Sequence, residues 1–217
     1  DITGEENLWA HRPCVFAFNH QSNFDGLIMM KLLRKDVTGV AKAELKHMPV
    51  IGALFSLGDV VFIDRSDHDK SVEALNEAAN TIRSGLSVAI APEGTRQLSP
   101  RLGEFKKGAF HMAIEADAPV VPIVIHNSLD VLPKGSRVMR PATVHIDVLD
   151  AIDAGAEALA NTPRVKIEGV GDVLAEKLVT FFRQPHNQDV IAKLIEVVPE
   201  KEGAVERDGR TQGLLTT

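Results

Sequence analysis

The chain has 217 residues, a formal net charge of −6, and 44% hydrophobic and 25% charged residues. A chain of this size and composition is able to bury a full hydrophobic core as one globular domain. Its acidic balance argues against general nucleic-acid binding, which relies on a basic excess. It contains no apolar run long enough to cross a bilayer and no secretory signal pattern.

The chain begins at Asp1 and reaches its first motif at His20, so we expect a fragment or a processed form. We predict a single domain over residues 1–200 and a disordered tail over residues 201–217, which are polar and aperiodic. Cys14 is the only cysteine, which excludes an intrachain disulfide and favours a reducing, cytosolic setting. Because Cys14 lies within an apolar run, we interpret it as a small buried hydrophobic residue.

Hydrophobic periodicity predicts strands and helices that alternate along the chain. Strands are expected at residues 14–18, 38–42, 59–63, 87–91, 120–125 and 143–149, and helical segments at 24–35, 44–57, 67–84 and 107–116. This alternation indicates an α/β fold with a mostly parallel central sheet flanked by helices. Two amphipathic helices near the C-terminus, over residues 170–181 and 190–198, are expected to pack on the flank of the domain.

A histidine and an aspartate follow the first expected strand, in the sequence Asn19-His20-Gln21-Ser22-Asn23-Phe24-Asp25. A carboxylate on one ring nitrogen fixes the imidazole tautomer, so that the other nitrogen is able to take a proton from an alcohol. His20 and Asp25 are therefore candidate catalytic residues. The chain has no Gly-x-Ser-x-Gly nucleophile elbow, which favours direct activation of the alcohol without an acyl-enzyme. The alternative is that Asp25 only caps the helix and His20 is a polar loop residue.

Basic side chains follow other strands. Arg65 ends the strand 59–63 in the sequence Ile63-Asp64-Arg65, and its guanidinium fork suits a phosphate. If the strands are parallel, Arg65 reaches the same sheet edge as His20. The alternative is a surface ion pair with Asp64. Lys42 and Lys106 are two further candidate substrate-binding residues, and we expect Lys106 to bind phosphate at a helix start.

A sharp turn is predicted in the sequence Ala91-Pro92-Glu93-Gly94-Thr95-Arg96, directly after the strand 87–91. The turn makes Glu93, Thr95 and Arg96 candidate substrate-binding residues. Arg96 is suited to bind phosphate, and Glu93 to orient a hydroxyl or an arginine. The alternative is an ordinary polar loop between a strand and a helix. The cluster Asp67-His68-Asp69 superficially suggests metal ligands, but we interpret it as the start of the helix 67–84 and expect no metal site.

Together and in this order, these segments resemble the glycerolipid acyltransferase superfamily, and in particular the 1-acylglycerol-3-phosphate acyltransferases. The matching motifs are His-x-x-x-x-Asp at His20 to Asp25, Phe-Ile-Asp-Arg at residues 62–65, Pro-Glu-Gly-Thr-Arg at residues 92–96 and Val-Pro-Ile at residues 121–123. Each motif is common alone, whereas four in order at these spacings are highly specific. The match runs from Cys14 to about Leu149.

The resemblance implies acyl transfer from acyl-CoA or acyl carrier protein to the free hydroxyl of lysophosphatidic acid, giving phosphatidic acid, without any cofactor beyond that co-substrate. By the family's pattern His20 is the base and Asp25 its orienting partner, and Arg65, Glu93, Gly94 and Arg96 bind the acceptor. We expect a membrane surface as a partner, on the cytoplasmic side, reached peripherally or through a segment outside this chain. No nucleic-acid partner is expected.

Several alternatives stay open at this stage. The acceptor could instead be glycerol 3-phosphate or a glycolipid alcohol. A thioesterase could use the same histidine and aspartate to activate water, and a lipid-binding module could retain the fold without catalysis.

Overall fold

The computed structural model describes residues 1–49, 51–64, 66–96, 103, 105–132, 136 and 138–153. Arg65, the two expected C-terminal helices and the expected tail over 201–217 lie outside the described residues. Within the described part of the chain, no helix is long and apolar enough to span a membrane.

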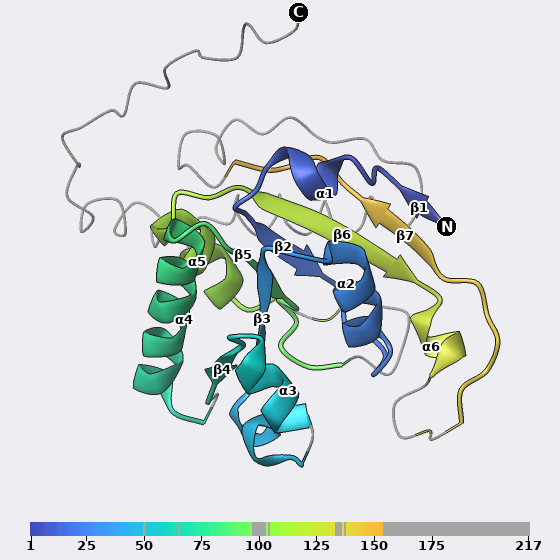
Figure 1. Ribbon diagram of the computed structural model, residues 1–217, viewed down its shortest axis with the longest axis horizontal. Coiled ribbons are helices and arrows are strands. Elements are labelled where there is room, and N and C mark those ends of the chain that lie inside the picture. Colours follow the sequence, from blue (N-terminus) through green and yellow to red (C-terminus); the bar gives the residue numbers. More distant parts are fainter. Residues whose placement is uncertain are drawn as a thin grey trace, which may run out of the picture.

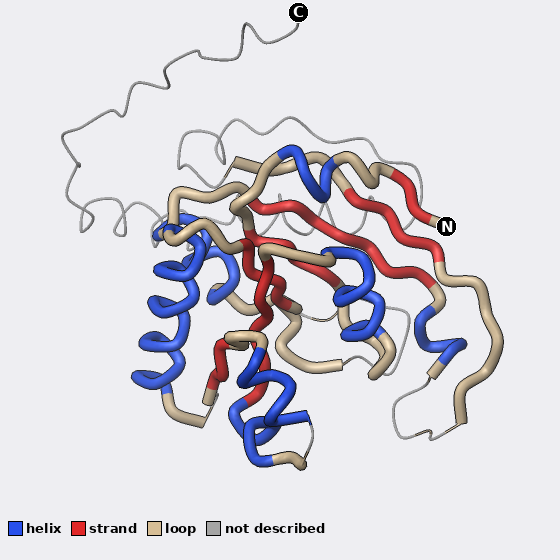
Figure 2. Tube along the Cα trace, viewed as in Figure 1, coloured by secondary structure: helices blue, strands red, loops and turns tan. Residues whose placement is uncertain are grey.

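The described strands form one sheet in the order β1-β7-β6-β2-β5-β3-β4 (Figures 1 and 2). Their bounds are β1 (Ile2–Thr3), β2 (Val15–Phe18), β3 (Val37–Lys42), β4 (Val61–Ile63), β5 (Ser87–Ile90), β6 (Val120–His126) and β7 (His145–Val148). Every neighbouring pair is parallel except β6 and β7. The predicted α/β class with a mostly parallel sheet is confirmed.

Helices cover both faces of this sheet. They are α1 (Asn7–Ala10), α2 (Asp25–Leu33), the 3-10 helix η1 (Ala43–His47), α3 (Ile51–Leu57), α4 (His68–Arg83), α5 (Gly108–Glu115) and α6 (Ser128–Val131). Side chains alternate between the faces along a strand. Accordingly Val15 of β2 belongs to the apolar cluster with α4 and α5, and the next residue, Phe16, to the cluster with α1 and α2. Burying both faces explains why the central strands are continuously apolar.

The longest helix shows how closely the sequence signals mark the elements. Asp67 accepts a hydrogen bond from the amide of Lys70 at 3.2 Å and so caps α4. The prediction that the cluster Asp67-His68-Asp69 is the start of this helix is therefore confirmed. At the other end Gly85 has a φ of +104°, a conformation that glycine adopts without steric cost. Ala78 and Ile82 face the core and are buried.

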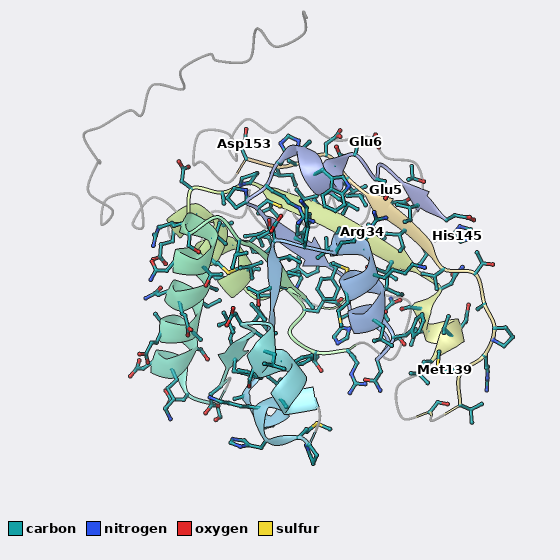
Figure 3. All side chains as sticks on the ribbon, in the orientation of Figure 1. Glu5, Glu6, Arg34, Met139, His145 and Asp153 are labelled. Carbon is teal, nitrogen blue, oxygen red and sulfur yellow. The ribbon has the colours of Figure 1, made fainter. Side chains whose placement is uncertain are left out.

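Arginine side chains hold the far end of α2, the helix that begins at Asp25. Arg12 donates to the carbonyl oxygen of Leu33 at 2.9 Å, and its guanidinium carbon lies 4.4 Å from the centre of the Trp9 ring. Arg34 pairs with Glu5 at 3.4 Å, and both are labelled in Figure 3. A cation at the C-terminal carbonyls of a helix is favourable, so this cluster ties α2 to the N-terminal segment.

Two details of the sheet were not predicted from the sequence. The strand predicted at residues 143–149 corresponds to β7, and β1 pairs with it on its outer side, at Ile2↔Ile146. Proline favours edge strands, yet Pro122 lies in β6, which is an interior strand. Its missing N–H is tolerated because the β7 ladder stops at Ile123↔Val148 and resumes only as an isolated bridge at Val120↔Ile152.

Candidate active site

The turns that carry the candidate residues meet at one edge of the sheet. Strand β2 is parallel to β5 on one side and to β6 on the other, so their carboxyl ends point the same way. His20 follows β2, and the turn at residues 91–96 follows β5. This is the edge at which ligands bind in parallel α/β sheets.

The His20 ring and the Asp25 carboxylate are hydrogen-bonded, with 2.9 Å between Nδ1 and Oδ2. The same carboxylate oxygen accepts from the amides of Gln21 at 2.7 Å and Ser22 at 2.8 Å. Asp25 is fully buried, whereas the His20 side chain is 28% exposed. If Nδ1 carries the proton that Asp25 accepts, Nε2 keeps a lone pair that is able to accept a proton from solvent or substrate.

Two features of the main chain surround the Asp25 carboxylate. Asp25 is the first residue of α2, where the helix dipole stabilises negative charge. Two main-chain amides converge on its Oδ2. Its other oxygen, Oδ1, is buried and has no hydrogen-bond partner in the described structure. The carboxylate therefore directs its bonds to the turn that carries His20.

Glu93 lies behind His20, with only 2% of its surface exposed. Its Oε1 accepts from the main-chain amide of His20 at 2.9 Å, and its Oε2 from the amide of Gly103 at 2.7 Å. Gly94 follows with a φ of +71°, and its amide donates to the carbonyl oxygen of Ala91 at 3.0 Å. The predicted sharp turn is therefore present, and the Glu93 carboxylate is bonded to main-chain amides on its inner side.

The basic candidates lie at different places along the same edge. The Arg96 guanidinium is hydrogen-bonded to the Asn23 side chain, which brings a cation beside the turn between His20 and Asp25. Lys106 has an exposed side chain, and its amide donates to the carbonyl oxygen of Pro92 at 2.8 Å.

Two other candidates are more loosely attached. Thr95 is exposed, and Lys42 is exposed at the end of β3, where it pairs with Glu44 at 3.4 Å. Hydrogen bonds in the described structure thus connect His20 to Asp25 and Glu93, and Arg96 to the same turn through Asn23. Lys42 instead pairs with Glu44.

Two polar residues of the motif were not singled out by sequence reasoning. Asn19 is 3% exposed, and its side-chain amide bonds both main-chain groups of Ile125 on β6. Ser22 is fully buried, donates from Oγ to the carbonyl oxygen of Leu132 at 2.6 Å and accepts from the amide of Phe24 at 3.0 Å. The available signal was a run of polar residues directly after an apolar strand, which favours partners on other elements.

Comparison with solved structures gives the fold class. The chain is similar to the crystal structure of the 1-acyl-sn-glycerophosphate (LPA) acyltransferase PlsC from Thermotoga maritima, with a TM-score of 0.64 and 22% sequence identity. The superposition covers 89% of this chain and 71% of the PlsC chain. The chain therefore has the α/β fold of that acyltransferase. A sequence model of the family described as Acyltransferase matches residues 1–126, and the chain belongs to this family.

Two curated relatives are similar over most of the chain. The 1-acyl-sn-glycerol-3-phosphate acyltransferase of Saccharomyces cerevisiae is 35% identical over 186 residues, or 84% of this chain. Human 1-acyl-sn-glycerol-3-phosphate acyltransferase beta is 32% identical over 164 residues, or 75% of this chain. In both cases the chain spans 59% of the relative's length. The resemblance to the glycerolipid acyltransferases is thereby confirmed.

Proposed function

We propose that this protein transfers a fatty acyl group from a thioester, acyl-CoA or acyl carrier protein, to the free hydroxyl of lysophosphatidic acid, giving phosphatidic acid. The observation that carries the proposal is the pairing of a partly exposed His20 with a buried Asp25 at 2.9 Å, beside the guanidinium of Arg96. The names of the relatives, which are 1-acyl-sn-glycerol-3-phosphate acyltransferases, support the choice of acceptor.

His20 performs the proton transfer in this mechanism. Its Nε2 takes the proton of the acceptor hydroxyl as that oxygen attacks the thioester carbonyl carbon, and Asp25 stabilises the imidazolium that forms. When the tetrahedral intermediate collapses, the carbon–sulfur bond breaks and the imidazolium returns the proton to the departing thiolate. A general base of this kind contributes roughly 10²–10⁴ to the rate.

The acceptor phosphate is bound by arginine in this proposal. Arg96 bonds to Asn23, in the turn between His20 and Asp25. In the proposed complex, a phosphate on Arg96 places a neighbouring glycerol hydroxyl within reach of the imidazole. A guanidinium donates two parallel hydrogen bonds to a phosphate. In this proposal Arg65 and Lys106 supply further positive charge, and Thr95 is exposed on the turn that follows β5.

Apolar side chains near the site support contact with lipid. Leu27 and Met30 lie one helical turn apart on α2 and are 57% and 56% exposed. Met139, labelled in Figure 3, is exposed in the segment that follows α6. We propose that these side chains contact acyl chains or the cytoplasmic surface of a membrane, to which the protein binds peripherally or through a segment outside this chain.

The test is an acceptor panel with one labelled acyl-CoA, repeated with acyl carrier protein, and with products identified by mass. Lysophosphatidic acid, glycerol 3-phosphate and a glycolipid alcohol are supplied separately. We expect phosphatidic acid from lysophosphatidic acid and no product from the His20→Ala variant. Equal consumption of acyl-CoA without any acceptor would instead indicate a thioesterase, and lipid binding without turnover in the unmodified protein would indicate a binding module.

A further inference from the structure

The main chain around His20 is held from two sides by buried polar side chains. Asn19 and Glu93 are 3% and 2% exposed, and neither lies in solvent where a substrate binds. Asn19 connects the chain to β6 on one side of β2, and Glu93 connects it to the turn after β5 on the other. His20 therefore sits between two attachments that belong to different neighbouring strands.

The Asn19 side chain continues the sheet by one step. The β2–β6 ladder ends at Phe18↔Ile123. Beyond it, Asn19 Nδ2 donates to the carbonyl oxygen of Ile125 at 2.9 Å, and the amide of Ile125 donates to Asn19 Oδ1 at 2.7 Å. The Asn19 side-chain amide thus bonds to Ile125 as the main-chain N–H and C=O groups of a neighbouring strand would. A side chain that offers only one of these groups would leave a buried main-chain group of Ile125 unpaired.

The Glu93 carboxylate connects two main-chain amides that are distant in sequence. It accepts from His20 at 2.9 Å and from Gly103 at 2.7 Å, and both bonds go to a charged acceptor, which makes them stronger than neutral ones. No oxygen of this carboxylate faces away from the protein, because the residue is almost fully buried. Its geometry is that of a brace for the catalytic turn.

We propose that Asn19 and Glu93 are positioning residues, which fix the main chain of His20 so that its ring meets Asp25 and the acceptor hydroxyl at the same time. They act through His20 and contact no substrate. This inference rests on the proposed function. It replaces the expectation that Glu93 orients a hydroxyl of the acceptor or an arginine.

The structure gives a reason for two attachments. Among the described residues the His20 ring makes one hydrogen bond, to Asp25, and the ring is partly exposed, so its position depends on the main chain that carries it. A displacement of about 1 Å at reacting groups costs about 100-fold in rate. Loss of either attachment is therefore expected to lower the rate of the chemical step and to leave substrate binding unchanged.

The first test separates positioning from binding at Glu93. The Glu93→Gln variant keeps one acceptor and turns a donor toward the other amide. We expect kcat to fall by about 10- to 100-fold, with the KM values for lysophosphatidic acid and acyl-CoA unchanged. Glu73→Gln, at an exposed position of α4, is the matched control and should retain full kcat. A raised KM for lysophosphatidic acid with unchanged kcat would overturn the proposal, because it would make Glu93 an acceptor ligand.

The second test uses a conservative change at Asn19. A protonated carboxyl has a donor and an acceptor, as the amide does, whereas the ionised form has no donor. The activity of Asn19→Asp relative to the unmodified protein should therefore be lowest at alkaline pH and rise as the pH falls. Asn76→Asp, an exposed change on α4, is the control. A ratio that does not change with pH would contradict the proposal. If N19D does not fold, Asn19→Ser replaces it and should lower kcat without raising either KM.

A spectroscopic test does not depend on turnover. In protein with labelled histidine, the ring proton that His20 shares with Asp25 should give a downfield proton NMR signal, identified by its loss in His20→Ala. We expect this signal to weaken or broaden in E93Q while circular dichroism stays unchanged. An unaltered signal would count against the proposal. If the unmodified protein transfers no acyl group, the proposed function is refuted. The NMR signal would still test whether Asn19 and Glu93 fix the main chain of His20.

Discussion

Asp25→Asn tests the central pair most directly, because it keeps the shape of the side chain and removes its charge. The structure brings His20 Nδ1 to 2.9 Å from Asp25 Oδ2, so the centres of the two charges are about 4 Å apart when the ring is protonated. For a site near the surface this pair interacts with about 4 kcal/mol. Loss of the charge should therefore lower kcat by about 10³-fold.

The same substitution should have a smaller effect on folding. An amide oxygen in the place of Oδ2 still accepts from Gln21 and Ser22. The NH₂ group then takes the place of the buried Oδ1, which has no partner among the described residues. Burying an unsatisfied donor costs about 1–3 kcal/mol. We therefore expect a lower melting temperature for a variant that still folds.

The assay is turnover with both substrates saturating, at a temperature where circular dichroism shows the variant folded. Asp147→Asn is a matched control, because Asp147 Oδ2 lies 2.8 Å from the Nε2 of His126 in a second histidine–aspartate pair. This control should keep kcat within about twofold, since the second pair is not part of the proposed mechanism. Folded D25N protein with more than about a tenth of the original kcat would refute the reasoning.

Three further predictions concern single residues. Burial raises the pKa of the Cys14 thiol to about 11, so iodoacetamide should leave Cys14 unmodified in native protein near neutral pH and label it in denaturant, as followed by mass spectrometry. Burial, and then the charge of Lys107, lower the pKa of His111, so its NMR titration midpoint should lie below the ordinary value of roughly 6.5. Because the pKa of His111 is depressed in the folded state, its contribution to stability is present above the unfolded pKa and is lost as the pH falls through the folded pKa. Denaturant titrations at several pH values would measure this change in the free energy of unfolding. Arg96→Gln should raise the KM for lysophosphatidic acid by about tenfold or more, as loss of a charge-assisted hydrogen bond predicts; an unchanged KM would remove Arg96 from the acceptor site.

The sequence was sufficient for most of the elements and for the proximity of His20 and Asp25. Local signals mark these features: apolar runs for the central strands, Asp67 and Gly85 at the ends of α4, and the short spacing from His20 to Asp25. The two-residue strand β1 was missed because Ile2–Thr3 is too short to show any periodicity. It exists only through its pairing with β7.

The roles of Asn19 and Glu93 could not be predicted, because their partners are far away in the sequence. Asn19 bonds to Ile125, and Glu93 bonds to His20, so each interaction depends on which strands are neighbours. The order of strands in a parallel sheet is set by crossover connections that no local pattern specifies. Sequence alone therefore identified Glu93 as a polar residue at the right edge and gave no indication of the direction in which its carboxylate points.

The turn after β5 has a buried inner side and an exposed outer one. Its inner side, Glu93, is committed to main-chain amides, while Thr95 and the nearby Lys106 are open to solvent. If the proposed function holds, exchanging either exposed residue would change the surroundings of an incoming headgroup and leave the bonds of Glu93 to the main chain intact. Acceptor preference would then be able to diverge among such proteins, or to be redesigned, without altering the residues proposed to transfer the proton.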